Sequence, residues 1–115
     1  MNLESMLKEF ITKFDIPKGE FTDNLVNERI EMLKEELEEI IFAADNWQEV
    51  EFLDGLVDLV YFAIGTAVIL DYKFNEAFKR VHEANMQKVR AHTERSAVDL
   101  IKPPGWVKPN LEDLV

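Results

Sequence analysis

The chain has 115 residues, the length of one ordinary domain with a single hydrophobic core. It contains no cysteine, which excludes disulfide bonds and thiolate zinc sites and suits a reducing compartment. A formal net charge of −10 argues against a nucleic-acid partner, because affinity for a phosphate backbone comes largely from lysine and arginine.

Helical spacing of apolar residues dominates the first half of the chain. A short amphipathic helix is predicted over about residues 3–14, and this segment lacks the basic region of a secretory signal. Thr22 or Asp23 can cap a second helix that ends near residues 45–46. The predicted apolar stripe of this helix consists of Leu25, Val26, Ile30, Leu33, Leu37, Ile40 and Ile41.

A third helix is expected from about Gln48 to Leu70, and it is apolar on nearly all sides after Asp58. Its uninterrupted apolar run, residues 59–70, is shorter than the ~20 residues that span a bilayer, so we expect no membrane partner. A helix this apolar must be enclosed by other helices or by a second subunit. We therefore expect an oligomer with this helix at its centre.

A fourth helix is predicted from Phe74 to about Arg90, and the proline-containing segment around residues 102–106 reads as extended. No strand signal or internal repeat is evident. The sequence thus predicts one all-α domain over residues 1–115, with an antiparallel four-helix bundle-like protomer. Its extended tail, about residues 97–115, is free to wrap a neighbouring subunit.

Acidic residues interrupt the apolar third helix. Glu51, Asp54 and Asp58 fall within one arc of it, because an α-helix turns about 100° per residue. Burying such carboxylates costs several kcal/mol each unless a cation compensates, and few lysines or arginines lie nearby. Gly55, placed among these acids, indicates a close approach by another helix or a ligand. A bound divalent metal is the economical explanation.

The second helix offers a matching set of acids. Glu36 and Glu39 lie one turn apart, with Glu35 beside Glu39. If the two helices pack face to face, four or five carboxylates converge, and Mg2+ prefers such oxygen ligands. This pattern fits metal-assisted chemistry on a phosphate, where the ion orients the ligand and lowers the pKa of an attacking water. The alternative for this helix is a solvated face, of which the run Glu28-Arg29-Ile30-Glu31 is typical.

The same acids match a family signature. Glu36-x-x-Glu39 followed by Glu51-x-x-Asp54 resembles the ExxE…ExxD signature of the all-α nucleoside triphosphate pyrophosphohydrolases. That group contains MazG, dimeric dUTPases, dCTP pyrophosphatase and phosphoribosyl-ATP pyrophosphohydrolase. The resemblance covers about residues 22 to 111 and is strongest to the small MazG-like branch of bacteria and phages. The segments that carry this part of it are residues 54–67, Phe78 to Lys88, and Lys102-Pro-Pro-Gly-Trp106.

The resemblance implies a helical dimer or tetramer that uses Mg2+ or Mn2+ to hydrolyse a (deoxy)nucleoside triphosphate to monophosphate and pyrophosphate. It also implies a cytoplasmic enzyme, located in the bacterial cytoplasm or, if the protein is phage-encoded, in the cytoplasm of the host. The metal ligands carried over by position are Glu36, Glu39, Glu51 and Asp54, and Asp58 is added because it shares their face. Relatives that read ExxD-Leu-Leu-Tyr would instead place their aspartate at Asp58, which leaves Gly55 where their glutamate stands.

Other roles follow from the same comparison. Glu35 or Glu39 is expected to accept the proton of the attacking water. Asn85 and Lys88 match the Asn-Met-x-Lys pattern and are expected to contact phosphate or nucleotide. Four aromatic residues are candidates to stack a base, although the sequence does not distinguish them from core aromatics. They are Trp47, Tyr61, Phe62 and Trp106.

Two rival functions stay open. The first is phosphoribosyl-ATP pyrophosphohydrolase of histidine biosynthesis, which would use similar acids on a different nucleotide. The second is a non-enzymatic acidic helical interaction module, which predicts no Mg2+ dependence and leaves the acids of the third helix unexplained. A carboxylate-bridged di-iron bundle is disfavoured because Lys79 and Val89, not glutamates, stand three residues before His82 and His92.

Overall fold

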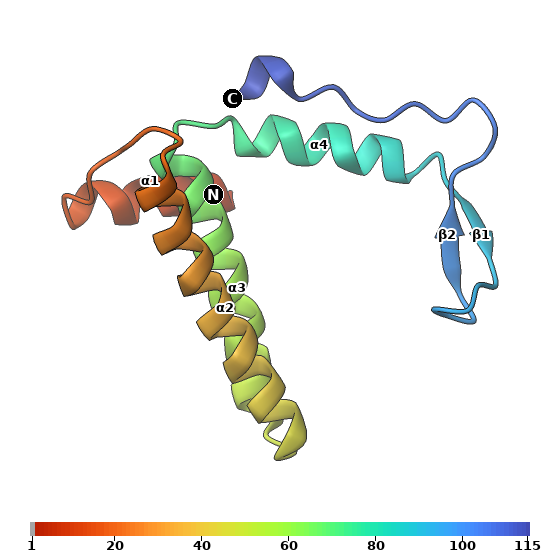
Figure 1. The fold of residues 1–115 in the computed structure, drawn as a ribbon, viewed down its shortest axis with the longest axis horizontal. Coiled ribbons are helices and arrows are strands. Elements are labelled where there is room, and N and C mark those ends of the chain that lie inside the picture. The colour runs from red at the N-terminus through yellow and green to blue at the C-terminus, as the bar shows by residue number, and fades with distance from the viewer. Residues whose placement is uncertain (1) are drawn as a thin grey trace. The chain divides into compact units, whose positions relative to one another are not determined.

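A computed structural model describes residues 2–115 of the chain (Figure 1). Helices make up most of this range, which confirms the predicted all-α class. The elements in chain order are α1 (Leu3–Lys13), α2 (Asp23–Asp45), α3 (Glu49–Ile69), α4 (Phe74–Asn85), β1 (Val89–Ala91), β2 (Asp99–Ile101) and the 3-10 helix η1 (Glu112–Leu114). The chain divides into two compact units, the first ending at Tyr72 and the second running from Lys73 to Val115. The single domain over residues 1–115 therefore stays a prediction.

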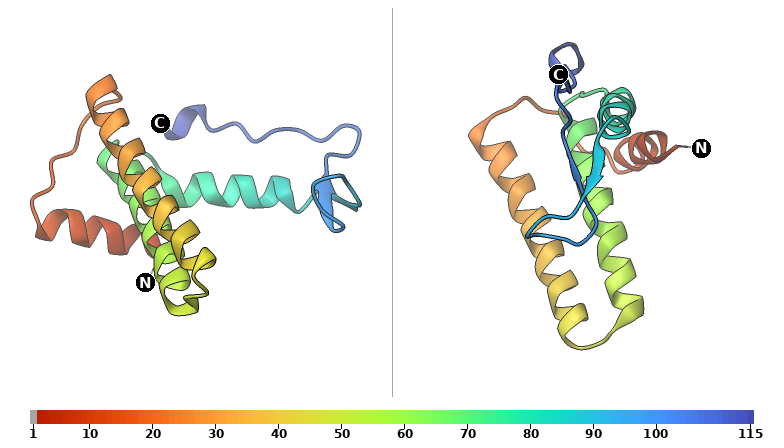
Figure 2. Two further views of the ribbon diagram at one scale, coloured as in Figure 1. Left: turned by 60° about the horizontal axis from the view of Figure 1, so that its bottom comes forward. Right: turned by 90° about the vertical axis from the view of Figure 1, so that its right-hand side faces the viewer.

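The first unit is built on a hairpin of α2 and α3, which lie side by side in every view (Figures 1 and 2). The predicted bounds of both helices agree with the structure. Thr22 caps α2 as expected, because its Oγ1 accepts a hydrogen bond from the Leu25 N–H at 3.4 Å. Gly55 permits the close approach of the two helices, since a Cβ at this position would lie 2.7 Å from Ile40 Cγ1.

Helix α1 packs across the C-terminal half of α3 (Figure 2). Leu7 and Ile11 of α1 are buried there, together with Ile64 and Val68 of α3. The Phe10 ring adds an edge contact to Tyr61, with ring centroids 5.3 Å apart. The core of the first unit is therefore concentrated at this end of the hairpin.

The apolar stripe predicted for α2 is buried only in part. Ile40 is buried, whereas Ile30, Leu37 and Ile41 are 41%, 49% and 51% exposed. The line of α2 that faces α3 runs through Glu36, Ile40 and Ala43, so Leu37 and Ile41 lie to one side of it. Part of the predicted stripe thus remains uncovered within the protomer.

The second unit corrects two predictions. Helix α4 ends at Asn85 rather than near Arg90, and the residues that follow form an antiparallel pair of strands in which Val89 lies opposite Ile101. Each strand has three residues, too few to produce a recognisable alternation of apolar and polar positions. The lack of a strand signal in the sequence therefore did not exclude this short pair, and the predicted extended tail begins instead with a strand.

The tail is not extended throughout, because it contains β2 and η1 and then returns along α4 (Figure 1). The Trp106 indole N–H donates to the carbonyl oxygen of Ala84 at 2.7 Å. Arg80 Nη1 forms an ion pair with Asp113 at 2.6 Å. Each of these contacts anchors the tail to α4 of its own chain.

Helix α3 is the one helix of residues 2–115 that is long and apolar enough to cross a membrane, judged by length and composition only. The length of α3 includes its acidic N-terminal half, which lies outside the apolar run of residues 59–70. Core helices of soluble proteins can be equally long and apolar, and 33% of the most apolar stretch of α3 is buried. The expected absence of a membrane partner stays a prediction.

Candidate active site

Three predicted metal ligands converge between α2 and α3. Glu36 and Glu39 come from one turn of α2, and Asp58 comes from α3. One carboxylate oxygen of each lies within 4.8 Å of the others. They meet because Gly55, just before Asp58 on the same helix, lets α3 approach α2 closely. We call Glu36, Glu39 and Asp58 the carboxylate cluster.

The carboxylate cluster carries charge that no cation in the structure offsets. Among residues 2–115, no lysine, arginine or histidine forms an ion pair with its members. Burial raises the pKa of Glu36, and the charges of Glu39 and Asp58 raise it further. Burial also raises the pKa of Asp58, with added effects from the charges of Asp54 and Glu39. The cluster is thus electrostatically strained without a bound cation.

These residues fit a divalent metal ion. All three offer carboxylate oxygens, the ligands that hard cations such as Mg2+ and Mn2+ prefer. Glu36 Oε2 is shielded from solvent and has no hydrogen-bond partner among the described residues. A buried polar atom without a partner is costly, and coordination to a cation would satisfy it.

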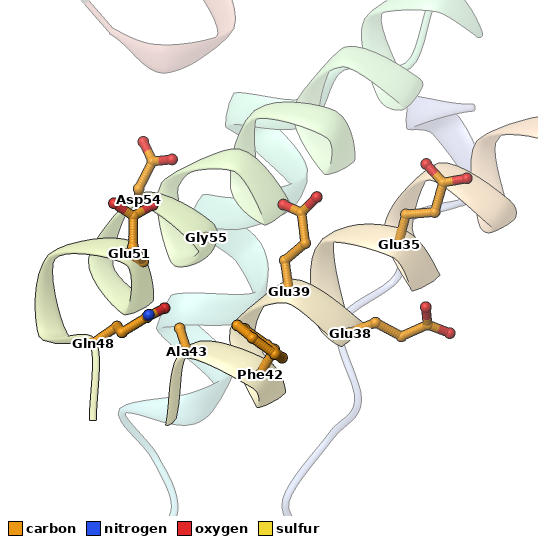
Figure 3. Close-up of a pocket in the computed structure, with 9 residues that line it drawn as sticks. All are labelled: Glu35, Glu38, Glu39, Phe42, Ala43, Gln48, Glu51, Asp54 and Gly55. Carbon is orange, nitrogen blue, oxygen red and sulfur yellow. The ribbon is translucent and has the colours of Figure 1, made fainter. Parts of the chain in front are cut away.

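The other predicted acids flank the carboxylate cluster. A hollow of about 800 Å³ lies beside the turn between α2 and α3, and its lining includes Glu35, Glu39, Glu51 and Asp54 (Figure 3). Glu39 therefore belongs both to the hollow and to the carboxylate cluster. Glu51 and Asp54 stand on α3 outside the group of three. The structure thus brings Asp58, rather than Glu51 or Asp54, closest to the pair on α2.

The predicted substrate-binding residues lie in the second unit. Asn85 is the exposed last residue of α4, and its carbonyl oxygen accepts a hydrogen bond from the Lys88 N–H at 3.1 Å. The Nζ atoms of Lys88 and Lys102 lie 5.4 and 5.1 Å from the centroid of the Trp106 ring. These contacts place two positive charges beside the Trp106 ring, in the second unit, where basic residues outnumber acidic ones.

Arg29 was missed as a functional candidate because its sequence neighbours are typical of a solvated face. In the structure it is half-buried, and its Nε donates to Thr66 Oγ1 at 2.9 Å while its Nη2 donates to the Phe62 carbonyl oxygen at 3.3 Å. Burial lowers the pKa of Arg29. The overlooked signal was helical spacing, because Arg29, Met32 and Glu36 recur on one side of α2.

Comparison with known proteins identifies the family of this chain. The family model described as phosphoribosyl-ATP pyrophosphohydrolase matches residues 2–85, which include all four α-helices, the carboxylate cluster and the acids that line the hollow. A search of curated proteins found no match. The match confirms the all-α pyrophosphohydrolase superfamily that the acid signature resembles, whose members hydrolyse a phosphoric anhydride. The chain belongs to the phosphoribosyl-ATP pyrophosphohydrolase family.

Proposed function

We propose that this protein is a Mg2+-dependent nucleoside triphosphate pyrophosphohydrolase, which converts a (deoxy)nucleoside triphosphate to the monophosphate and pyrophosphate. The observation that carries the proposal is the carboxylate cluster, with its buried and unpartnered Glu36 oxygen. A triphosphate and a group of carboxylates repel each other, so they can share a site only with cations between them. A cytoplasmic location, where nucleotides are made and used, accompanies this proposal.

The chain's residues would divide the work as follows. Glu36, Glu39 and Asp58 hold the ion, and Glu51 and Asp54 extend the acidic surface into the adjoining hollow. A bound Mg2+ supplies charge compensation for the phosphates and lowers the pKa of water at the site.

Proton transfer and substrate contact fall to other side chains. Glu35 and Glu39 both line the hollow, and either can accept the proton of the attacking water. Asn85 and Lys88 are the proposed contacts to phosphate or nucleotide, with Lys88 offsetting negative charge.

A second candidate, hydrolysis of phosphoribosyl-ATP in histidine biosynthesis, is favoured by the description of the matching family. This reaction cleaves the same kind of anhydride and would use the same carboxylate cluster. The two candidates therefore differ in the substrate bound rather than in the chemistry performed.

The deciding experiment is to incubate the protein with each common NTP and dNTP, and with phosphoribosyl-ATP, in Mg2+ or in EDTA. Monophosphate, pyrophosphate and orthophosphate are followed separately. We expect Mg2+-dependent release of pyrophosphate from nucleoside triphosphates. Turnover of phosphoribosyl-ATP alone would select the second candidate, and failure to release pyrophosphate from any substrate would reject both.

Glu39→Gln ties the activity to the carboxylate cluster. We expect it to lower pyrophosphate release by about 100-fold or more, because it removes a charged ligand from both the cluster and the hollow. Glu31→Gln is the matched control, since Glu31 lies on the same helix and pairs with Lys34 on its exposed surface. Equal activity of the two variants would exclude this site.

A further inference from the structure

A second cavity lies between α1, α2 and α3, on the side of the hairpin that α1 covers. Its volume is about 430 Å³, within the range of small-molecule sites. The walls are mainly apolar and include the rings of Phe10, Tyr61 and Phe62. Flat aromatic ligands stack well on such walls. We call this space the α1 cavity.

The α1 cavity adjoins the carboxylate cluster, because Asp58 belongs to both. A ligand with an anionic end held by cations at the cluster would therefore have the rest of its body beside the cavity. A nucleotide has this form, with phosphates at one end and a flat base at the other.

Arg29 is the one basic residue in the wall of the α1 cavity among residues 2–115. Its Nε and Nη2 donate to Thr66 and to the Phe62 carbonyl oxygen, but its Nη1 makes no hydrogen bond within the described chain. A guanidinium group can only donate, so the unused N–H groups require an acceptor from a ligand or from water. No carboxylate forms an ion pair with Arg29 in this range.

We infer that the α1 cavity holds the base of the nucleotide and that Arg29 selects bases carrying a carbonyl oxygen. This inference rests on the proposed function and adds a substrate preference to it. Uracil, thymine, cytosine, guanine and hypoxanthine carry a carbonyl oxygen, whereas adenine has no carbonyl group and accepts only through its ring nitrogens. Where an amino group of the base faces the partly buried Arg29 donor instead of a carbonyl oxygen, that donor stays unpaired and binding is weaker. Thr66 is a positioning residue, because its hydroxyl oxygen holds the Arg29 Nε.

Inosine and adenosine triphosphates are the sharpest pair of substrates, because their bases differ chiefly in a carbonyl or an amino group at one ring position. We expect kcat/KM with Mg2+ to favour the inosine triphosphate by about tenfold or more. The phosphate-free nucleosides inosine and adenosine, whose binding is measured by calorimetry in EDTA, should show the same order of affinity. Uridine triphosphate, whose base also has carbonyls, should behave like the inosine nucleotide.

Arg29→Met should remove the preference. We expect it to lower kcat/KM for carbonyl-bearing nucleotides about tenfold and to change kcat/KM for the adenine nucleotide little. Lys34→Met is the matched control, because it removes a positive charge from the exposed side of the same helix. Should Arg29→Met fail to fold, Thr66→Val tests the same point by releasing the guanidinium. Thr66→Ser should restore the preference because it restores the hydroxyl.

The inference is overturned if Arg29→Met or Thr66→Val folds and keeps the preference. It is also overturned if either variant lowers kcat/KM equally for all nucleotides, as loss of a phosphate contact would. Failure of the proposed function is a different result. It would appear as no pyrophosphate release from any triphosphate by the unmodified protein. The preference for inosine over adenosine in EDTA would still be present in that case, since a nucleoside carries no phosphate and its base needs no metal.

Discussion

Asp58 is the residue at which the two possible alignments of the acid signature differ. It lies with Glu36 and Glu39 in the carboxylate cluster, while Asp54 stands close enough for its charge to raise the pKa of Asp58. We expect Asp58→Asn to lower pyrophosphate release by about 100-fold or more and Asp54→Asn to lower it by about tenfold, as for a neighbour of a ligand. The measurement is the rate of pyrophosphate release at saturating Mg2+. The reverse order would support Glu51 and Asp54 as the second pair.

The raised pKa of Glu36 predicts how stability depends on pH without metal. Because the folded protein binds a proton at Glu36 more tightly than the unfolded chain does, stability falls as pH rises from the ordinary glutamate value of 4.5 through the higher folded value. Glu36→Gln should flatten this part of the dependence. Urea unfolding at several pH values in EDTA, with both proteins, measures the difference. Identical pH profiles for the two proteins would contradict the burial of this charge.

The sequence predicted the acids but not their grouping. Helical periodicity places Glu51, Asp54 and Asp58 on one arc, and this arc is wide enough that only the packing of α2 against α3 decides which residue faces Glu36. For the same reason the sequence did not predict a role for Arg29, because that role depends on a hydrogen bond to Thr66 of another helix. Residue types and spacing therefore indicate a site, while ligand partners depend on helix rotation.

At the scale of elements, Gly55 controls the spacing of the hairpin. Its absent side chain leaves room for Ile40, since a Cβ would lie 2.7 Å from Ile40 Cγ1. We expect Gly55→Ala to destabilise the protein by about 1–3 kcal/mol through overpacking, although alanine favours a helix by about 0.5–1 kcal/mol. Urea unfolding gives this change.

Gly65→Ala in the same helix is the control for Gly55→Ala. A Cβ there would lie 3.3 Å from Arg29 Nη2 and 3.5 Å from Leu7 Cδ1, so only a small adjustment of these side chains would be needed. Gly65→Ala should therefore lower the free energy of unfolding much less than Gly55→Ala does, and the helix preference of alanine can even raise it. Equal destabilisation by the two variants would show that close approach at Gly55 is not the special constraint.

Helix bounds were more predictable than strands. The bounds of α2 follow from a cap at Thr22 and a long periodic pattern, and these local signals survive in the fold. β1 and β2 depend instead on a turn in which Asp99 accepts a hydrogen bond from Thr93 Oγ1 at 2.7 Å and forms an ion pair with Arg95. No periodic pattern in so short a segment announces such pairing.

At the scale of the whole molecule, α2 and α3 expose apolar side chains that a single copy of the chain leaves in contact with water. Leu37 and Ile41 on α2 are about half exposed, and Leu53 and Val57 on α3 are 62% and 54% exposed. Leu37 and Ile41 lie one turn apart on α2, as Leu53 and Val57 do on α3, and neighbouring exposed apolar residues of this kind are typical of interfaces. We therefore propose that a second copy covers these two helices.

This proposal predicts a homodimer or homotetramer by light scattering at micromolar concentration, because burial of apolar surface contributes about 25 cal/mol per Å². Leu37→Asp should shift the protein toward monomer, since it places a charge on the uncovered side of α2. Val107→Asp is the control, because Val107 is similarly apolar and 77% exposed but lies in the tail. A monodisperse monomer of the unmodified protein would contradict the proposal. A monomeric Leu37→Asp protein that still hydrolyses its substrate at the full rate would show that each protomer holds a complete site.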